Sequence, residues 1–268
     1  MSGLRRRGFP AEGIRDFVTM VGVAKADNVV EMGMLEHAVR GVLNRTAPRR
    51  FAVLDPLKVV VENYPEGQTE EVEVPNNPED PSAGTHKVAF GRELWIERGD
   101  FMEVPVRKFF RLAPGREVRL RSAYFITCTE VVKDAAGEIV ELRCSYDPAT
   151  RGGDAPDGRR PKATLHWVSA VDAITAEVRL YDHLFTRADP GVDGDLLADL
   201  NPKSEEVLRG CLVEPALASV PTGQTVQFER LGYFCPDPDS KPGHPVFNRT
   251  LTLKDTWVKL QTKGMQND

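Results

Sequence analysis

Glycine and proline recur so often along this chain that long regular elements have no room to form. The 268 residues include 22 glycines and 20 prolines, and each of these residues tends to end a helix or a strand. The stretches between them are short and rich in β-branched and aromatic residues, as at Val59–Val61 and Leu94–Ile96, which is typical of strands. The pattern excludes a bundle of long helices and favours many short strands joined by turns.

Two amphipathic patterns predict helices within residues 10–46. The first begins at Pro10, which suits a first helical turn, and Gly22 predicts its end. The second ends before Pro48, because proline cannot continue a helix. Apolar residues recur on one face of each pattern: Ile14, Phe17, Val18 and Val21 in the first, and Leu35, Val39, Val42 and Leu43 in the second.

From Phe51 onward the period is that of strands. The runs expected to be strands are Val59–Val61, Glu71–Val74, Leu94–Ile96, Val118–Thr129, Ile139–Tyr146, Ala163–Ser169, Ala176–Tyr181, Val226–Phe234 and Val246–Leu253. Asp134–Gly137 indicates a hairpin loop, residues 147–161 a longer loop, and the acidic segment Asp193–Leu200 a helix. Strands at this spacing favour barrels or sandwiches, so we expect a helical N-terminal part followed by two β units.

The formal net charge of −5 excludes a uniformly basic nucleic-acid-binding protein, but the charges are segregated along the chain. Residues 62–80 carry seven acidic side chains and no basic one, whereas residues 102–121 carry six basic side chains against two acidic ones. Such segregation can build a local positive face on an acidic protein. A run of charge is more often a solvated face, so charge alone leaves both interpretations open.

Several other classes of protein find no support in the sequence. No run approaches the roughly 18 apolar residues of a membrane helix, and no apolar stretch of a secretory signal follows the basic N-terminus. The four cysteines match no CxxC pattern, which favours a reduced, cytoplasmic protein without structural zinc. His166, Ser169 and Asp172 lie at spacings that specify no catalytic triad, so we expect no catalytic residue and no metal site.

One group of basic and aromatic residues is a stronger candidate for a binding site. It consists of the segment Arg107–Arg111 followed by Glu117–Arg121. On a strand, Arg119 and Arg121 would lie on one face roughly 7 Å apart, with the apolar residues between them pointing inward. Guanidinium groups suit phosphate oxygens and guanine edges, and the two phenylalanines of the first segment can offer a stacking surface for unpaired bases. The alternative is that one phenylalanine lies in the core and the arginine stems only cover apolar surface. From the residues alone the two readings carry equal weight.

A set of motifs spans nearly the whole chain, from Gly3–Gly8 to Asp255–Trp257. The motifs between these ends are Ala47–Arg49, Asp55–Pro56, Glu62–Tyr64, Glu117–Arg121, Leu165–Ala170, Val178–Asp182, Gln227–Arg230 and Phe247–Thr250. In residues and order, this set resembles the C-terminal half of bacterial glutaminyl-tRNA synthetases, a class I family. The family's two ATP-site signatures, similar to His-Ile-Gly-His and Lys-Met-Ser-Lys-Ser, are absent from this sequence. The resemblance therefore implies that the chain starts just after the family's catalytic domain ends, at a truncation point or a displaced start.

The resemblance implies a helical connecting subdomain over residues 1–47 and a first anticodon-binding β-barrel over residues 48–150. A second anticodon-binding β-barrel would cover residues 151–260, and a tail would cover residues 261–268. The expected fold class is therefore mainly β, with an N-terminal α-helical subdomain and two consecutive β-barrels.

The resemblance also implies a function, which is recognition of the anticodon of glutamine tRNA for a glutamine–tRNA ligase. The expected partner is glutamine tRNA, with no DNA and no membrane, and the expected state is a cytoplasmic monomer. ATP, with magnesium, would be used by the absent catalytic domain, so we expect no cofactor in this chain and no catalysis by it alone. Two alternatives stay open: the anticodon-binding half of a glutamyl-tRNA synthetase, and a free-standing tRNA-binding module.

Carried over residue by residue, the family's contacts fall first on four side chains. Arg49 and Gln227 align with residues that hold the central anticodon base, a uracil, where the two barrels join. Arg111 and Arg230 align with readers of the guanine at the third position. A bidentate contact from arginine to O6 and N7 of guanine makes physical sense there.

The remaining contacts fall at the first anticodon base and on the tRNA backbone. Arg119 aligns with the residue at the first base, and Arg121 lies beside it. Lys25, Asn28 and Asn44 align with residues of the helical part that contact the tRNA backbone.

Two positions depart from the family pattern. The family often has glutamine at the position of Lys108 and lysine at the position of Phe110. The basic charge has therefore moved by two residues, and these two contacts are not carried over.

Overall fold

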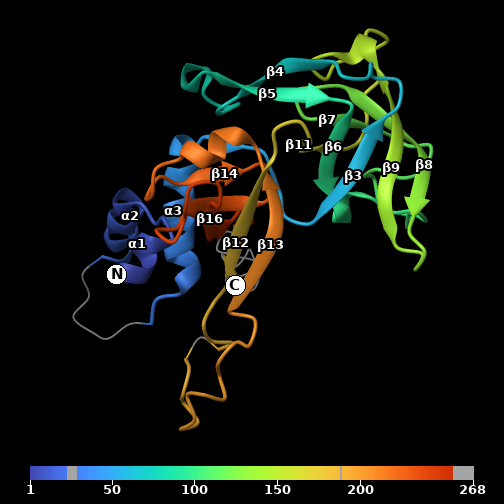
Figure 1. Cartoon of the computed structure of the whole chain (residues 1–268). Coiled ribbons are helices and arrows are strands. Elements are labelled where there is room, and N and C mark those ends of the chain that lie inside the picture. Colours follow the sequence, from blue (N-terminus) through green and yellow to red (C-terminus); the bar gives the residue numbers. More distant parts are fainter. Residues whose placement is uncertain (23–28, 188, 256–268) are drawn as a thin grey trace, which may run out of the picture. The chain divides into compact units, whose positions relative to one another are not determined.

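The computed structural model describes residues 1–22, 29–187 and 189–255 and is mainly β, with its α-helices in the N-terminal part (Figure 1). The chain divides into two compact units. Unit 1 comprises Met1–Arg49, Glu177–Arg209 and Val220–Asp268, and unit 2 comprises Arg50–Ala176 and Gly210–Ser219. The expected fold class is confirmed, with two barrel-like sheets, one nearly closed and the other a half-barrel. The four expected domain ranges stay a prediction.

Three α-helices form the N-terminal part of unit 1: α1 (Ser2–Arg6), α2 (Ala11–Val21) and α3 (Met32–Thr46). The two longer helices confirm the sequence prediction, and Gly22 ends α2 with a φ of +71°, which glycine adopts without strain. Gly13 lets α2 approach α3 closely, because a Cβ atom there would lie 2.8 Å from the Cα of Val39. Among the described residues, no helix has the length and apolar character needed to cross a membrane.

The sheet of unit 1 has the order β14-β15-β16-β12-β13, with β1 (Arg49–Arg50) beside β14. Its strands are β12 (Ile174–Tyr181), β13 (Glu205–Val213), β14 (Val226–Phe228), β15 (Gly232–Pro236) and β16 (Val246–Thr252), and the boundary between the units falls within β12 and β13. The pairs β14–β15 and β15–β16 are antiparallel, whereas β12 and β16 are parallel. Phe228 stacks on Phe234 at 4.1 Å and meets Phe247 edge-on at 5.2 Å. These buried rings join three strands into one core.

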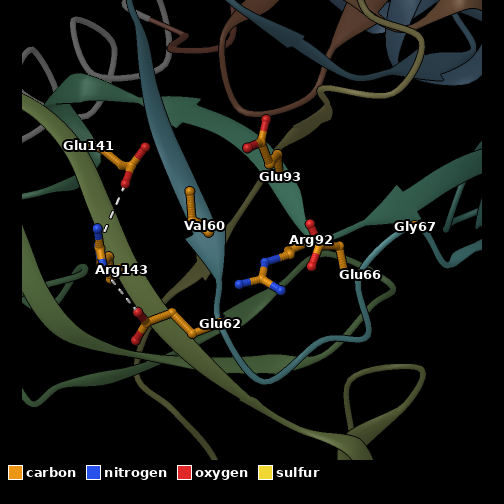
Figure 2. Close-up of a pocket in the computed structure, with 8 residues that line it drawn as sticks. All are labelled: Val60, Glu62, Glu66, Gly67, Arg92, Glu93, Glu141 and Arg143. Carbon is orange, nitrogen blue, oxygen red and sulfur yellow. Dashed lines mark hydrogen bonds and ion pairs between the residues drawn. The ribbon is translucent and has the colours of Figure 1, made fainter.

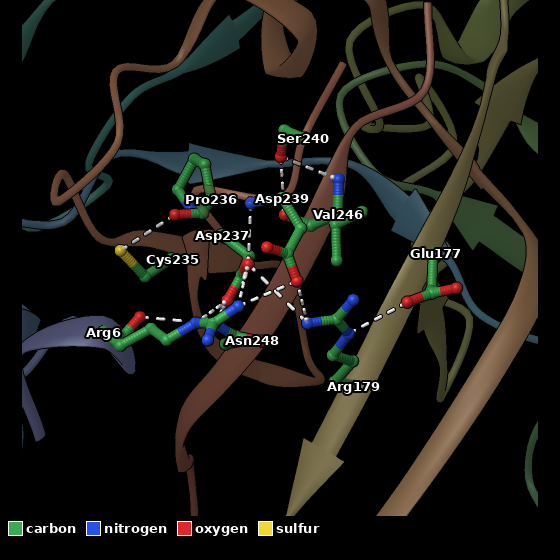
Figure 3. Close-up of polar contacts among 10 residues, drawn as sticks. All are labelled: Arg6, Glu177, Arg179, Cys235, Pro236, Asp237, Asp239, Ser240, Val246 and Asn248. Carbon is green, nitrogen blue, oxygen red and sulfur yellow. Dashed lines mark hydrogen bonds and ion pairs between the residues drawn. The ribbon is translucent and has the colours of Figure 1, made fainter. Parts of the chain in front are cut away.

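A polar network ties the N-terminal segment to this sheet (Figure 3). Arg6 donates to Asp237 at 2.7 and 2.8 Å and to Asp239 at 2.8 Å, and Asn248 also donates to Asp237. Arg179 of β12 reaches Asp239 at 3.0 Å. Burial of Asp237 raises its pKa, but the hydrogen bond from Arg6 and those from its other donors outweigh burial and hold the pKa of Asp237 well below its usual range.

Gly8 lets the same N-terminal segment pack closely against the sheet of unit 1. Its φ of +81° is one that favours glycine, and a Cβ atom there would lie 2.4 Å from the Cβ of Cys235. The hydroxyl of Thr225 donates to the carbonyl oxygen of Gly8 at 2.7 Å. The first nine residues are therefore part of the packed body of unit 1.

Unit 2 contains a seven-stranded sheet in the order β10-β7-β8-β9-β3-β6-β11. Its strands are β3 (Pro56–Val61), β6 (Glu93–Glu97), β7 (Glu117–Leu120), β8 (Phe125–Lys133), β9 (Ile139–Asp147), β10 (Thr164–Leu165) and β11 (Val168–Ser169). A separate hairpin is formed by β4 (Thr69–Pro75) and β5 (Thr85–Gly91), and β2 (Ala52–Val53) pairs with the end of β13. The short 3-10 helices are Pro81–Ala83, Arg98–Asp100, Pro148–Thr150 and Pro215–Ser219. The loop predicted at Asp134–Gly137 does join β8 to β9.

Trp167 lies at the centre of the core of unit 2, with no part of it exposed. Its ring contacts Phe51 at 5.6 Å and Phe90 at 5.3 Å, measured between ring centroids. Phe90 in turn contacts Tyr64 and Tyr124. Aromatic pairs at these separations add to the stabilisation that comes from area burial.

The sequence prediction was wrong where a turn lacks glycine and proline. Val118–Thr129 was expected as one strand, but it forms β7 and β8 with a turn between them. Val226–Phe234 likewise forms β14 and β15, and Ala163–Ser169 forms the two-residue strands β10 and β11. The strands β1, β2, β5 and β13 were not predicted.

The expected helix at Asp193–Leu200 was also wrong, because this segment forms only turns and an isolated bridge. Asp195 Oδ1 accepts hydrogen bonds from the backbone nitrogens of Leu197 and Ala198, and Asp199 accepts one from that of Gly191. Aspartate side chains that bond to nearby backbone groups compete with helix formation. The acidic composition therefore produces turns here.

The network around Asp237 makes unit 1 sensitive to acid. The pKa of Asp237 is lower in the folded than in the unfolded chain, so its contribution is present above the unfolded value of about 3.9 and is lost as the pH falls below it. Asp237→Asn should lower the free energy of unfolding at pH 7 by about 2 kcal/mol, the scale of a hydrogen bond to a charged group. It should also flatten the loss of stability below pH 4. Urea unfolding of both proteins at pH 7 and pH 3 measures this. Equal slopes with pH would contradict the assignment.

Candidate nucleic-acid interface

The structure divides the expected contact residues between the two units. Unit 2 carries Arg111, Arg119 and Arg121, and unit 1 carries Asn44, Arg49, Gln227 and Arg230. Lys25 and Asn28 lie outside the described residues.

The exposed face of β7 carries the arginines of unit 2. Val118 and Leu120 are fully buried, whereas Glu117, Arg119 and Arg121 are partly exposed. This is the alternation that the sequence predicts, although Arg121 lies just beyond the strand, in the turn that follows it. The face is extended by β10, which pairs with β7 in parallel and places Thr164 opposite Arg119.

Arg119 is held in place by its surroundings. Its guanidinium lies 5.4 Å from the centre of the Phe125 ring, and a Cβ atom on Gly153 would lie 3.2 Å from its Cδ. Its Nε is buried and has no hydrogen-bond partner among the described residues, and its Nη2 lies 3.6 Å from a carboxylate oxygen of Asp154. The side chain of Arg119 is 28% exposed and that of Asp154 is 94% exposed. The guanidinium that we expect to contact RNA is thus already paired with a solvent-exposed carboxylate.

The loop that carries Asp154 is fixed at both ends by arginines. Arg151 donates to Glu70 at 3.0 Å. At the other end, Arg159 donates to Glu117 at 3.0 Å, to Asp157 at 2.6 Å and to Asp147. The hydrogen bonds to Glu117, Asp147 and Asp157 raise the pKa of Arg159 further above its usual value. Asp154 is therefore presented from an anchored loop.

Arg121 lies in a turn that backbone and side-chain bonds hold from several sides. The backbone nitrogen of Ala123 donates to the carbonyl oxygen of Leu120 at 3.1 Å, which closes the turn. The indole of Trp167 donates to the carbonyl oxygen of Arg121 at 3.0 Å, and the nitrogen of Arg121 donates to Leu165 at 2.8 Å. Ser122, the third residue of the turn, has a φ of +59°.

Arg111 is differently placed from the other arginines of unit 2. Its Nε lies 3.3 Å from a carboxylate oxygen of Asp100, which is buried, and its Nη1 donates to the carbonyl oxygen of Gly99 at 3.1 Å. Two of the guanidinium's five N–H donors thus face partners within the protein. Arg111 would have to release them to make a bidentate contact with a base.

In unit 1, Arg49 and Gln227 come together at the start of the sheet. Both are buried, they lie on the neighbouring strands β1 and β14, and the nitrogen of Gln227 donates to the carbonyl oxygen of Pro48 at 2.9 Å. The helical residue Asn44 accepts a hydrogen bond from the hydroxyl of Tyr233, which fixes its amide group.

Arg230 lies in the turn between β14 and β15. The backbone nitrogen of Leu231 donates to the carbonyl oxygen of Phe228 at 2.9 Å, so Glu229 and Arg230 are the central residues of a turn. Arg230 has a φ of +67°, in the region that a type II turn requires at this position and that normally selects glycine. If Gln227 and Arg230 are to reach neighbouring bases, the alternation of a strand must be broken between them, and this turn breaks it.

Some residues of this surface carry no signal in the sequence. Asp154 and Arg159 lie in a loop, and only the fold brings them to β7. In the sequence, Trp167 stands out only as part of the motif Leu165–Ala170. Its hydrogen bond to Arg121 spans 46 positions, which no local pattern reveals.

A second region of unit 2 is hollow but has the wrong charge for RNA (Figure 2). A pocket of about 470 Å³ is lined by four glutamates and two arginines: Glu62, Glu66, Glu93, Glu141, Arg92 and Arg143. Arg143 is already paired with Glu62 at 3.3 Å and with Glu141 at 3.7 Å. The excess of carboxylates would repel a phosphate. Among the described residues, no group of three or more His, Cys, Asp and Glu side chains is placed to hold a metal ion.

Comparison with known proteins identifies the family to which these residues belong. Two family models match the chain, over residues 47–147 and 164–237, and both are described as the anticodon-binding domain of class I tRNA synthetases (E and Q). The chain belongs to the class I E and Q tRNA synthetases. The first anticodon-binding match covers β7 with Arg111, Arg119 and Arg121, and the second covers β14 with Gln227 and Arg230.

The chain is also similar to three curated glutamine–tRNA ligases. That of Nitrobacter hamburgensis is 61% identical over 98% of this chain and 47% of the relative. Those of Bradyrhizobium diazoefficiens and Pseudomonas putida are 59% and 51% identical over 98% and 96% of this chain. The chain spans about half the length of these relatives.

We expect the left-handed conformation of Arg230 to lower the free energy of unfolding of this anticodon-binding domain. A side chain in the left-handed region costs about 1–2 kcal/mol, and glycine avoids most of that cost. Arg230→Gly should therefore raise the free energy of unfolding by about 1 kcal/mol. Urea unfolding measures this, with Arg107→Gly as a matched control at an arginine that lies outside the helices and strands and whose φ is not positive. A destabilised Arg230→Gly protein would mean that the arginine side chain is needed to hold the turn.

Proposed function

We propose that this chain binds the anticodon loop of glutamine tRNA and serves as the recognition half of a glutamine–tRNA ligase. The observation that carries the proposal is the placement of arginines at strained turns. Ser122 and Arg230 are the non-glycine residues with positive φ among the described residues, and they lie in the turns that present Arg121 and Arg230. Strain of this kind persists where the surrounding structure enforces it and clusters at binding sites.

The chemistry of the exposed groups supports reading of unpaired bases. Arginine presents a planar set of donors that matches the O6 and N7 acceptors of guanine. Single-stranded loops expose these edges, whereas the deep, narrow major groove of duplex RNA hides them. An arginine at the end of a strand can reach an unpaired base, and the sheet that holds the arginine fixes where that base must lie.

The proposal favours glutamine over glutamate through the third anticodon base. The two amino acids' tRNAs differ at this base, and Arg111 and Arg230 are the residues we expect to read it as guanine. Arg230 is the candidate chosen for the test, because the turn between β14 and β15 fixes its position at the end of a strand. The names of the relatives also point to glutamine.

The alternative of a free-standing RNA-binding module differs in what precedes Met1. The attachment of glutamine with ATP belongs, in this proposal, to residues outside these 268. An in-frame genomic sequence before Met1 with the two ATP-site signatures would favour the ligase, and its absence would favour the module. Tight binding of random duplex RNA would count against recognition of an anticodon, whether that of glutamine tRNA or that of glutamate tRNA.

Arg230 should act as a specificity residue. Arg230→Ala should weaken binding of glutamine tRNA by about 1–3 kcal/mol. It should have far less effect on a tRNA altered only at the third anticodon base, because that contact is already lost. The measurement is binding of wild type and variant to each tRNA at fixed ionic strength. Arg121→Ala is the control, and it should weaken both tRNAs equally and reduce the salt dependence. An equal loss on both tRNAs with Arg230→Ala would make Arg230 a phosphate contact or a structural residue.

Asp154 should oppose RNA binding. Its carboxylate pairs with Arg119 in the free protein and would repel a phosphate brought to the same guanidinium. An exposed ion pair contributes about 0.2–1 kcal/mol, so Asp154→Asn should tighten tRNA binding by a factor of about 1.4 to 5 at low salt. The gain should shrink as salt rises.

The matched control for this prediction is Asp157→Asn. It removes the same charge from the same loop but from a residue that pairs with Arg159. Equal effects of the two variants would indicate a general effect of net charge. Weaker binding with Asp154→Asn would show that the carboxylate itself contacts the RNA.

A further inference from the structure

A small pocket of about 270 Å³ opens on unit 2 beside the start of β7. It is lined by Arg107, Phe109, Phe110, Arg116, Glu117 and Lys162. The pocket is lined by none of the tRNA-contact residues that the family resemblance implies for this chain. It coincides with the position where this chain has Phe110 in place of the lysine common in the family.

Phe110 gives the pocket an accessible aromatic surface. The residue is 48% exposed, although most phenylalanines of this chain are buried in the two cores. The ammonium of Lys162 lies 4.9 Å from the centre of its ring. A half-exposed ring with a cation beside it suits a planar, anionic ligand, because the ring can stack on a base while the cation meets a phosphate.

The charges around the ring are mostly positive and available. Within the described part of the chain, no ion pair with a carboxylate engages Arg107 or Lys162. The one carboxylate of the pocket, that of Glu117, is neutralised by Arg159, which donates to it at 3.0 Å. Arg116 donates to the carbonyl oxygens of Phe109 and Arg111, which fixes the wall of the pocket before any ligand arrives.

The sheet aligns this pocket with Arg119. Glu117 and Arg119 project from the same face of β7, and positions two apart on a strand are separated by roughly 7 Å. In the parallel pairing of β10 with β7, Thr164 is opposite Arg119, and Lys162, two residues before Thr164, lines the same pocket as Glu117. Neighbouring nucleotides of one RNA strand can therefore reach both places.

We propose that this pocket binds one unpaired nucleotide of the RNA, with its base stacked on Phe110 and its phosphate beside Arg107 and Lys162. The inference rests on the proposed function and adds a subsite that lies next to Arg119 along the strand. The acidic pocket of Figure 2 has the opposite charge and is not a second such site.

The test uses the full chain and an RNA hairpin that carries the anticodon stem and loop of glutamine tRNA. Each loop nucleotide is replaced in turn by an abasic one, and the Kd is measured by fluorescence anisotropy for wild type and Phe110→Ala. We expect Phe110→Ala to weaken binding of the intact hairpin about tenfold, within the range measured for loss of one stacked base. At one loop position the abasic replacement should weaken wild type similarly and should cost Phe110→Ala nothing more.

Three further variants make the result specific. Phe110→Trp should retain the affinity, because it keeps an aromatic surface. Val106→Ala, at an exposed apolar residue that does not line the pocket, should leave binding unchanged. Lys162→Gln should weaken binding and lower the slope of log K against log salt by about 0.7, the value for one contact with a single strand.

The outcomes separate this inference from the proposed function. If wild type binds no hairpin saturably, the proposed function itself fails. If wild type binds but Phe110→Ala is unchanged, only the stacking subsite is overturned. The subsite is also overturned if Phe110→Ala binds weakly but every abasic position costs it as much as it costs wild type, since Phe110 would then act on the fold and not on a base.

Discussion

The hydrogen bond from the indole of Trp167 to the carbonyl oxygen of Arg121 joins the core of unit 2 to its functional surface. Trp167 is fully buried against Phe51 and Phe90, and a buried indole nitrogen needs an acceptor. The acceptor it finds is the backbone of the turn between β7 and β8. The same bond that satisfies the core therefore fixes the direction in which Arg121 leaves the sheet.

Electrostatics in this protein is local. The chain is acidic overall, and several of its arginines are engaged by carboxylates, as Arg119 is by Asp154 and Arg159 is by Glu117. Such pairs hold loops in place and limit non-specific attraction to RNA, because a paired guanidinium must exchange one anion for another. Binding that depends on a few exposed cations and on base edges is more selective than binding by a broad positive surface.

Much of the fold could be predicted from the sequence, and the errors in which two strands were merged into one share a cause. The helices α2 and α3 and the strands β3, β9 and β16 follow from local periodicity. The turns at Arg121–Ser122 and Glu229–Arg230 were predicted as strand, since neither contains the glycine that a positive φ usually selects. The candidate site followed the same division. Arg119 and Arg230 could be named from motifs, but not the strained turn that holds Arg230 or the loop that covers Arg119.

The sequence by itself determined that short strands dominate, that the helices come first, and that Arg119 lies on the outer face of its strand, because these features depend on residues close together in the chain. Only the tertiary structure decided where the strands break and which charges meet. The backbone of Arg121 donates a hydrogen bond to Leu165 and accepts one from Trp167, Asp154 is brought to Arg119, and Lys162 is brought to Phe110. Each of these contacts joins residues more than thirty positions apart, and such contacts form only when the sheet assembles and its backbone groups find their partners.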